Sequence, residues 1–60
     1  MTVREIIKCV EHDGWYLCRT RGSHRQYKHP TKKGLVTIPG RRGQTLNIDM
    51  ERSILKQAGL

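Results

Sequence analysis

Large aromatic side chains and acidic residues are the scarcest components of this 60-residue chain. It has no phenylalanine, one tryptophan and two tyrosines, and only five aspartates and glutamates in all. A chain this short buries only about 60% of the surface that its unfolded form exposes, so its core is thin. A ligand pocket of roughly 300 Å³ or more would hollow out that core. We therefore expect no small-molecule ligand, and chemistry carried out at the surface on a large partner.

Cysteine is also scarce, since Cys9 and Cys18 are the only two and would close only a small loop. No stretch of sequence has the length and apolar character of a secretory or membrane-spanning segment. We therefore expect free thiols in a reducing compartment, the cytoplasm, and no membrane partner. A zinc site made from these cysteines with His12 and His29 would lack the close C-x₂-C or H-x₃₋₅-H pairs typical of zinc sites. We expect neither a metal nor another cofactor.

Positive charge is abundant: twelve lysines and arginines give a net charge of +7. The isoelectric point of about 10.1 lies in the range of nucleic-acid-binding domains. Most of the basic residues lie between Lys8 and Arg42, so the binding surface should be formed by the central part of the chain. A polyanionic partner explains this charge best, although charge that only maintains solubility is the alternative.

Apolar residues recur at helical spacing near both ends of the chain. Thr2 and Glu5 stand three apart, as the two members of a capping box do, and a glycine follows the apolar stripe. We expect a first helix over about 3–13, and a second one capped by Asn47 or Asp49. The two stripes comprise Val3, Ile6, Ile7 and Val10, and then Met50, Ile54, Leu55 and Ala58.

The residues between the two helical stripes have the character of short strands. Strands are predicted over Trp15–Thr20, His24–His29 and Leu35–Ile38, with turns at 21–23 and 31–34. A three-stranded sheet needs both helices on one face if the chain is to have a core. The expected fold is therefore α+β, a single domain over residues 1–60 with the order α-β-β-β-α and an antiparallel sheet. The predicted inward residues of the sheet are Trp15, Leu17, Tyr27, Val36 and Ile38.

The tripeptide Gly22-Ser23-His24 places the best candidate for acid–base chemistry on a tight turn. Imidazole gains or loses a proton near neutral pH, and neighbouring guanidinium groups attract phosphate. A histidine that merely contacts its neighbours is the alternative. The basic residues expected to bind RNA phosphates are Arg19, Arg21, Arg25 and Lys28 around the turn, and Arg41 and Arg42 in a later glycine-rich loop.

Other residues allow two interpretations each. His29 could share the chemistry, but its odd spacing from His24 favours the opposite face of an ideal strand, and a structural histidine at the strand end is the simpler interpretation. Trp15 and Tyr27 could stack on bases, but so small a chain needs its large side chains for the core. Arg41 and Arg42 could belong to a solvated, flexible loop.

Five segments of the chain carry a recognisable pattern. They are Gly14-Trp15, the run from Arg19 to Tyr27, His29-Pro30, Thr37-Ile38-Pro39 and the run from Arg52 to Leu60. Together they resemble the HicA family of toxins over essentially the whole chain. The resemblance implies a fold similar to double-stranded-RNA-binding domains, and an mRNA interferase that is silenced by a HicB-family antitoxin. It also implies that His24 is the catalytic histidine, on a turn formed with Gly22 and Ser23. The chain departs from the family pattern at Gly40-Arg41-Arg42, where many relatives have a histidine.

RNA carries its own nucleophile, the 2′-hydroxyl beside each phosphate. A protein therefore needs only to remove a proton, stabilise the phosphorane and protonate the leaving 5′-oxygen, and no metal is required. We predict His24 as general base or acid, Ser23 and the turn's N–H groups as phosphate-orienting groups, and a 2′,3′-cyclic phosphate as product. A noncatalytic module that binds RNA through the same basic surface is the alternative function.

Overall fold

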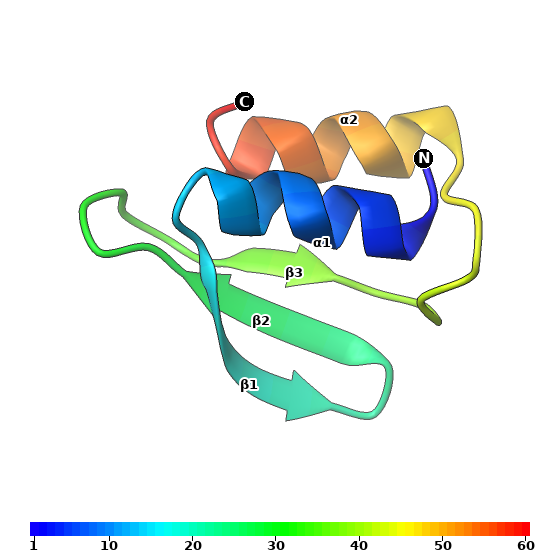
Figure 1. Cartoon of the computed structure of the whole chain (residues 1–60), viewed down its shortest axis with the longest axis horizontal. Coiled ribbons are helices and arrows are strands. Elements are labelled where there is room, and N and C mark those ends of the chain that lie inside the picture. The colour runs from blue at the N-terminus through cyan, green and yellow to red at the C-terminus, as the bar shows by residue number, and fades with distance from the viewer.

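The computed structural model describes residues 1–60 and places two helices over one face of a three-stranded sheet (Figure 1). This confirms the predicted α+β class and the order α-β-β-β-α. Along the chain the elements are α1 (Val3–His12), β1 (Tyr16–Arg21), β2 (His24–Lys28), β3 (Val36–Ile38) and α2 (Ile48–Gln57). Neither helix is long and apolar enough to cross a membrane.

Both helices begin and end at the residues that the sequence marks for this role. The Thr2 side chain accepts from the Glu5 N–H while the Glu5 carboxylate accepts from the Thr2 N–H, so the predicted capping box is confirmed. At the other end of α1, the N–H groups of Gly14 and Trp15 donate to carbonyls of the last turn, as in a Schellman motif. Asn47, rather than Asp49, caps α2 by accepting from the Met50 N–H.

The sheet is antiparallel, with β2 in the centre and β1 and β3 at the edges. Tyr27 of β2 pairs with Leu17 on one side and with Val36 on the other, so these three side chains project from the same face. A β-bulge interrupts the β1–β2 ladder between Leu17 and Arg19. The helices cover this face over β2 and β3, while every residue of β1 is exposed (Figure 1).

The core contains eleven buried residues, which include the whole predicted stripe of α1. Four of the five predicted inward residues of the sheet region are buried, namely Trp15, Tyr27, Val36 and Ile38. The prediction that Leu17 is buried is wrong. Its side chain faces the helical side but is 50% exposed, because β1 extends beyond the area that the helices cover. Met50 of the second stripe is also 40% exposed, and Leu46, in the loop before α2, fills the core instead.

Candidate active site

Antiparallel pairing brings three distant segments to one end of the sheet. Arg25 near the start of β2 pairs with Ile38 at the end of β3, so the β1–β2 turn lies beside the loop that follows β3. The first turn of α1 reaches the same end, because the Arg4 N–H donates to the Arg42 carbonyl. We call this end, formed by residues 21–24, the loop 39–43 and the start of α1, the hairpin end; it lies on the right in Figure 1.

Two residues, Gly22 and Ser23, make the whole connection between β1 and β2. Gly22 has φ of 60°, the left-handed value that a two-residue hairpin of this kind requires at its first position. Steric crowding does not require glycine here, since a Cβ at Gly22 would meet no atom within 4 Å. His24 follows the turn as the first residue of β2, which is where the strand prediction of His24–His29 begins.

The His24 side chain is exposed, and the hydrogen bonds and ion pairs of the chain leave its ring free. It projects from the sheet face opposite the helices, because the buried Tyr27 lies an odd number of residues away on the same strand. Arg21 is its direct cross-strand partner, and such partners have Cβ atoms about 4.5–5.5 Å apart. Arg19, opposite Gln26, is the diagonal neighbour at about 7–8 Å.

The predicted basic residues therefore divide into three groups around His24. Arg19 and Arg21 share its face and are its nearest charges. Lys28 shares the face but lies four residues further along the strand, about 13 Å away, and is exposed. Arg25 projects from the helical face instead, where its Nη1 donates to the Gly40 carbonyl at 2.7 Å.

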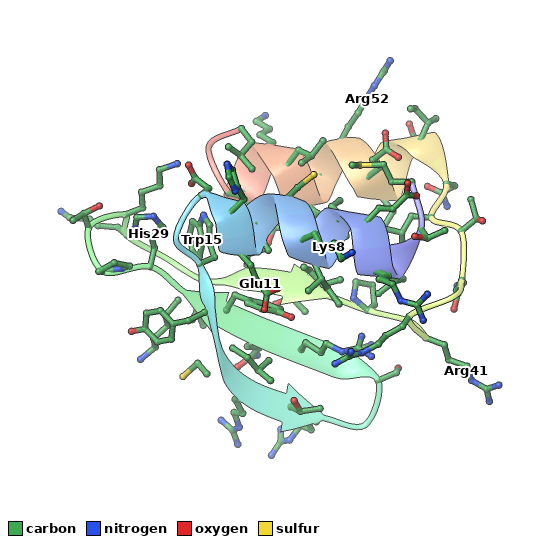
Figure 2. The ribbon with its side chains drawn as sticks, in the orientation of Figure 1. Lys8, Glu11, Trp15, His29, Arg41 and Arg52 are labelled. Atoms are coloured by element: carbon green, nitrogen blue, oxygen red, sulfur yellow. The ribbon has the colours of Figure 1, made fainter.

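The loop that carries Arg41 and Arg42 is held by hydrogen bonds on both sides. Besides the Arg25 bond, the Val3 and Arg4 N–H groups donate to the carbonyls of Gln44 and Arg42 at 2.8 and 2.9 Å. Both arginine side chains are exposed, and Figure 2 shows Arg41 pointing away from the molecule. The loop therefore holds the exposed side chains of Arg41 and Arg42 at the hairpin end. Arg4 of α1 adds a third exposed cation there.

The negative charges lie elsewhere, because the segment from Gly14 to Ile48 contains no aspartate or glutamate. All three strands and both loops of the sheet fall within this segment. The Thr2 N–H, which donates to the Glu5 carboxylate, holds the pKa of that group below its ordinary value. Lys32 does the same for Asp13 through a hydrogen bond to its carboxylate. Glu51 pairs with the N-terminal amine. No carboxylate of the strands opposes an approaching phosphate.

Comparison with known protein families shows which family this chain belongs to. Residues 3–60 match the family described as the HicA toxin of bacterial toxin-antitoxin. The chain belongs to the HicA toxin family. No curated protein sequence matches it. Membership of this family makes the chain a toxin of a toxin-antitoxin pair. Family membership therefore implies an antitoxin partner.

The second histidine of this HicA-family toxin has a different environment at the opposite end of the sheet. His29 Nδ1 accepts from the N–H groups of Thr31 and Lys32, both at 3.1 Å, so Nε2 carries the proton and donates to the Asp13 carbonyl at 2.7 Å. Its ring packs edge-on against Trp15, with centroids 5.2 Å apart (Figure 2). His29 is thus a structural residue, as the simpler interpretation had it.

Lys32 completes the contacts at that end of the molecule. Its Nζ donates to the Asp13 carboxylate at 2.6 Å and to the Ala58 carbonyl at 3.0 Å, which joins the ends of α1 and α2. We call the group of Asp13, Trp15, His29, Lys32 and the Ala58 carbonyl the hub end.

The aromatic residues of the toxin mostly serve the core, as predicted. Trp15 and Tyr27 are each 2% exposed, and burial raises the pKa of the Tyr27 hydroxyl. Neither ring is available to stack on a base. Tyr16 is half exposed, on the same sheet face as Lys28.

The residues considered for a metal site are dispersed. Cys9 lies half-buried on α1 and Cys18 is exposed on β1, and both are free thiols. His12 is exposed in the last turn of α1. No three His, Cys, Asp or Glu side chains gather where they could hold a metal ion.

Sequence reasoning missed two features of the site, and only the first of them is visible in the sequence. The absence of acidic residues between Asp13 and Asp49 can be seen without a structure and marks the sheet as the cationic region. The contribution of Arg4 could not be foreseen, because it depends on a backbone contact between α1 and the loop at Arg42.

Proposed function

We propose that this toxin is an endoribonuclease that cleaves mRNA without a metal ion, with His24 as general acid or base. The observation that carries the proposal is the position of His24. It is an exposed imidazole with no intramolecular partner, directly opposite Arg21 on a sheet without a carboxylate. A free, titratable ring beside a guanidinium is the combination that cleavage of a phosphodiester by its own 2′-hydroxyl needs.

The chemistry follows from the order of groups at the hairpin end. The neutral His24 ring removes the proton of a 2′-hydroxyl, and the 2′-oxygen attacks the adjacent phosphorus. The bond from phosphorus to the 5′-oxygen then breaks, and the leaving 5′-oxygen takes a proton from water. Arg21 and, next to it, Arg19 stabilise the additional negative charge of the phosphorane. The backbone N–H groups of Gly22 and Ser23, in the adjoining turn, orient the same phosphate. The products are a 2′,3′-cyclic phosphate and a 5′-hydroxyl.

The remaining basic groups bind the RNA on either side of the reacting phosphate. Lys28 lies too far from His24 to contact the same phosphate, so it contacts a neighbouring one. Arg41 and Arg42 hold the strand where it passes the β3–α2 loop. Arg25 supports this loop through Gly40, and we assign it a positioning role in place of a phosphate contact.

Membership of the HicA family supports a proposal for the setting of this activity. We propose that an antitoxin of the HicB family binds the toxin and covers His24, and that the toxin acts in the cytoplasm, where mRNA is translated. Acidic groups on the antitoxin would complement the net charge of +7 and speed association.

One observation favours the noncatalytic alternative. Catalytic histidines are often oriented by a hydrogen bond from the second ring nitrogen to a carboxylate, and the His24 ring has no such partner in the free chain. The same surface would then bind RNA without cutting it. The two functions differ in what happens to a bound transcript.

A cleavage assay in EDTA with end-group analysis tests the proposal. We expect cyclic phosphate and 5′-hydroxyl ends, and a rate that His24→Ala lowers by about 10²–10⁴-fold. RNA affinity should remain nearly unchanged, because one neutral ring contributes little to counterion release. His12→Ala, which removes an exposed histidine from α1, is the matched control and should cleave normally. Protection of RNA without cleavage, or cleavage that survives His24→Ala, would refute the proposal.

A further inference from the structure

Strand β1 is an uncovered edge of the sheet. It pairs only with β2, its six residues are all exposed, and none of them is a proline. In an antiparallel ladder, every second residue of an edge strand turns its N–H and C=O away from the sheet. A row of such groups is a template for another strand, and proteins usually shorten or cover it.

Both faces of β1 are open as well. Tyr16 and Leu17 are adjacent residues that project to opposite faces, and each is 50% exposed. The helices stop short of β1, so nothing in the chain covers Leu17 although it lies on the core side (Figure 1). A core limited to eleven buried residues leaves a large apolar side chain unused at this position.

The charges on β1 restrict what can pair with it. Arg19 and Arg21 are its only charged residues, and β1 of a second copy would carry the same positive charges. Like charges on paired strands are destabilising, and the bulge at Cys18 shortens the regular ladder further. These features oppose self-association but favour a strand with acidic side chains.

We propose that β1 is the docking edge for the antitoxin, which adds an extended, acidic segment as a fourth strand. The added strand hydrogen-bonds to the free backbone groups of β1, places acidic side chains near Arg19 and Arg21, and covers Leu17. This proposal rests on the antitoxin partner proposed above, but not on the nuclease activity. It places the partner along β1 as well as over His24.

Exchange and alkylation of the wild-type chain test the proposal directly. The toxin co-expressed with its antitoxin is compared with the free toxin by amide hydrogen exchange, and we expect at least tenfold slower exchange in residues 16–21. Cys18 is an exposed thiol at the bulge and should lose its reaction with iodoacetamide in the complex. Cys9, half-buried on α1, is the internal control and should react at the same rate in both samples.

Variants at Leu17 separate strand pairing from general charge attraction. Leu17→Glu places a negative charge against the acidic strand and should raise the dissociation constant by roughly five- to tenfold. Leu17→Lys loses the same apolar contact but places a positive charge there, so it should raise the dissociation constant less than Leu17→Glu does. Lys56→Glu makes a larger charge change on α2, away from β1, and should have the smaller effect of the two acidic variants.

The outcomes are distinct. Protection of 16–21 together with the Leu17→Glu effect supports the docking edge. A stable complex in which β1 exchanges as in the free toxin, or in which RNA rather than the antitoxin protects it, overturns this proposal alone. A complete lack of binding contradicts the HicB-family partner and, with it, the docking edge, whereas the cleavage assay is unaffected.

Discussion

The two ends of the sheet carry one histidine each, and the two rings have opposite surroundings. At the hub end, His29 uses both nitrogens in hydrogen bonds to the backbone, packs against Trp15, and has a side chain only 9% exposed. At the hairpin end, His24 is exposed and bonded to nothing in the chain. Lys32 is bound to Asp13 at the first end, while Arg21 faces no acidic group at the second.

The difference between the two histidines shows which end of this small domain has polar side chains that are free to bind a partner. Apart from Trp15 Nε1, which is buried without a partner, the polar groups of the hub end are satisfied within the fold, whereas an exposed group without a partner is available to a ligand. The hub end joins α1, β2 and α2, so its contacts contribute to stability. Residues 21–24 of the hairpin end, like Arg41 and Arg42, are exposed, so their side chains are available to a ligand.

The largest expected contrast is in stability between the two histidine variants. His29→Ala should lower the free energy of unfolding by about 2–4 kcal/mol, because it leaves the Thr31 and Lys32 N–H groups and the Asp13 carbonyl without their partner. His24→Ala should change it by less than about 0.5 kcal/mol. Urea denaturation followed by circular dichroism measures both. Equal losses would mean that the two ends do not differ as described.

A second contrast concerns Arg21 and Arg25, which project from opposite faces of the sheet. Arg21→Ala removes the charge opposite His24 and should lower the cleavage rate constant by about 10²-fold at saturating RNA. Arg25→Ala breaks the bond to Gly40 and should instead lower stability by about 1–2 kcal/mol, with a smaller effect on cleavage well below the unfolding temperature. Single-turnover kinetics and thermal unfolding separate the two. The reverse pattern would place the reacting phosphate on the helical face.

A glycine at each end sharpens the comparison further. Gly14 at the hub end has φ of 108°, and a Cβ there would lie 2.8 Å from His29 Nε2. Gly14→Ala should therefore cost about 2–3 kcal/mol of stability, from backbone strain and displacement of the ring. Gly22→Ala meets only the strain of a left-handed backbone and should cost about 1 kcal/mol. Similar losses at both positions would argue against the close Gly14–His29 contact.

The smallest expected effect is the pH dependence that Asp13 contributes at the hub end. Lys32 lowers the pKa of Asp13 in the folded chain, so the carboxylate stabilises the fold at pH values above its unfolded pKa of about 4. This contribution disappears as the pH falls through the folded pKa. Asp13→Asn should therefore be less stable than wild type at pH 7, and the difference should shrink below pH 4. Asp49→Asn, at an exposed position in the first turn of α2, is the control. A difference that stays constant from pH 7 to pH 2 would exclude this ion pair as its cause.

Local signals in the sequence predicted much of the fold. The capping box at Thr2, the apolar stripe of α1 and the glycine after it were sufficient because a helix depends on residues three and four apart. The strands were predicted to within a residue or two, and the bulge at Cys18 was not predicted, because an extra residue in one strand has no local mark. Leu17 was placed in the core for a different reason: alternation indicates a face of the sheet, but not whether a helix covers it.

The sequence by itself determined the charge, the element order and the presence of a histidine beside a glycine turn, because each depends on composition or on neighbours along the chain. Only the tertiary structure decided that Arg21 faces His24 while Arg25 faces the helices, that His29 is engaged at the opposite end, and that Arg4 and Arg42 lie together. Strand register and the packing of helices on the sheet set these relations, and both result from contacts between residues far apart in the chain.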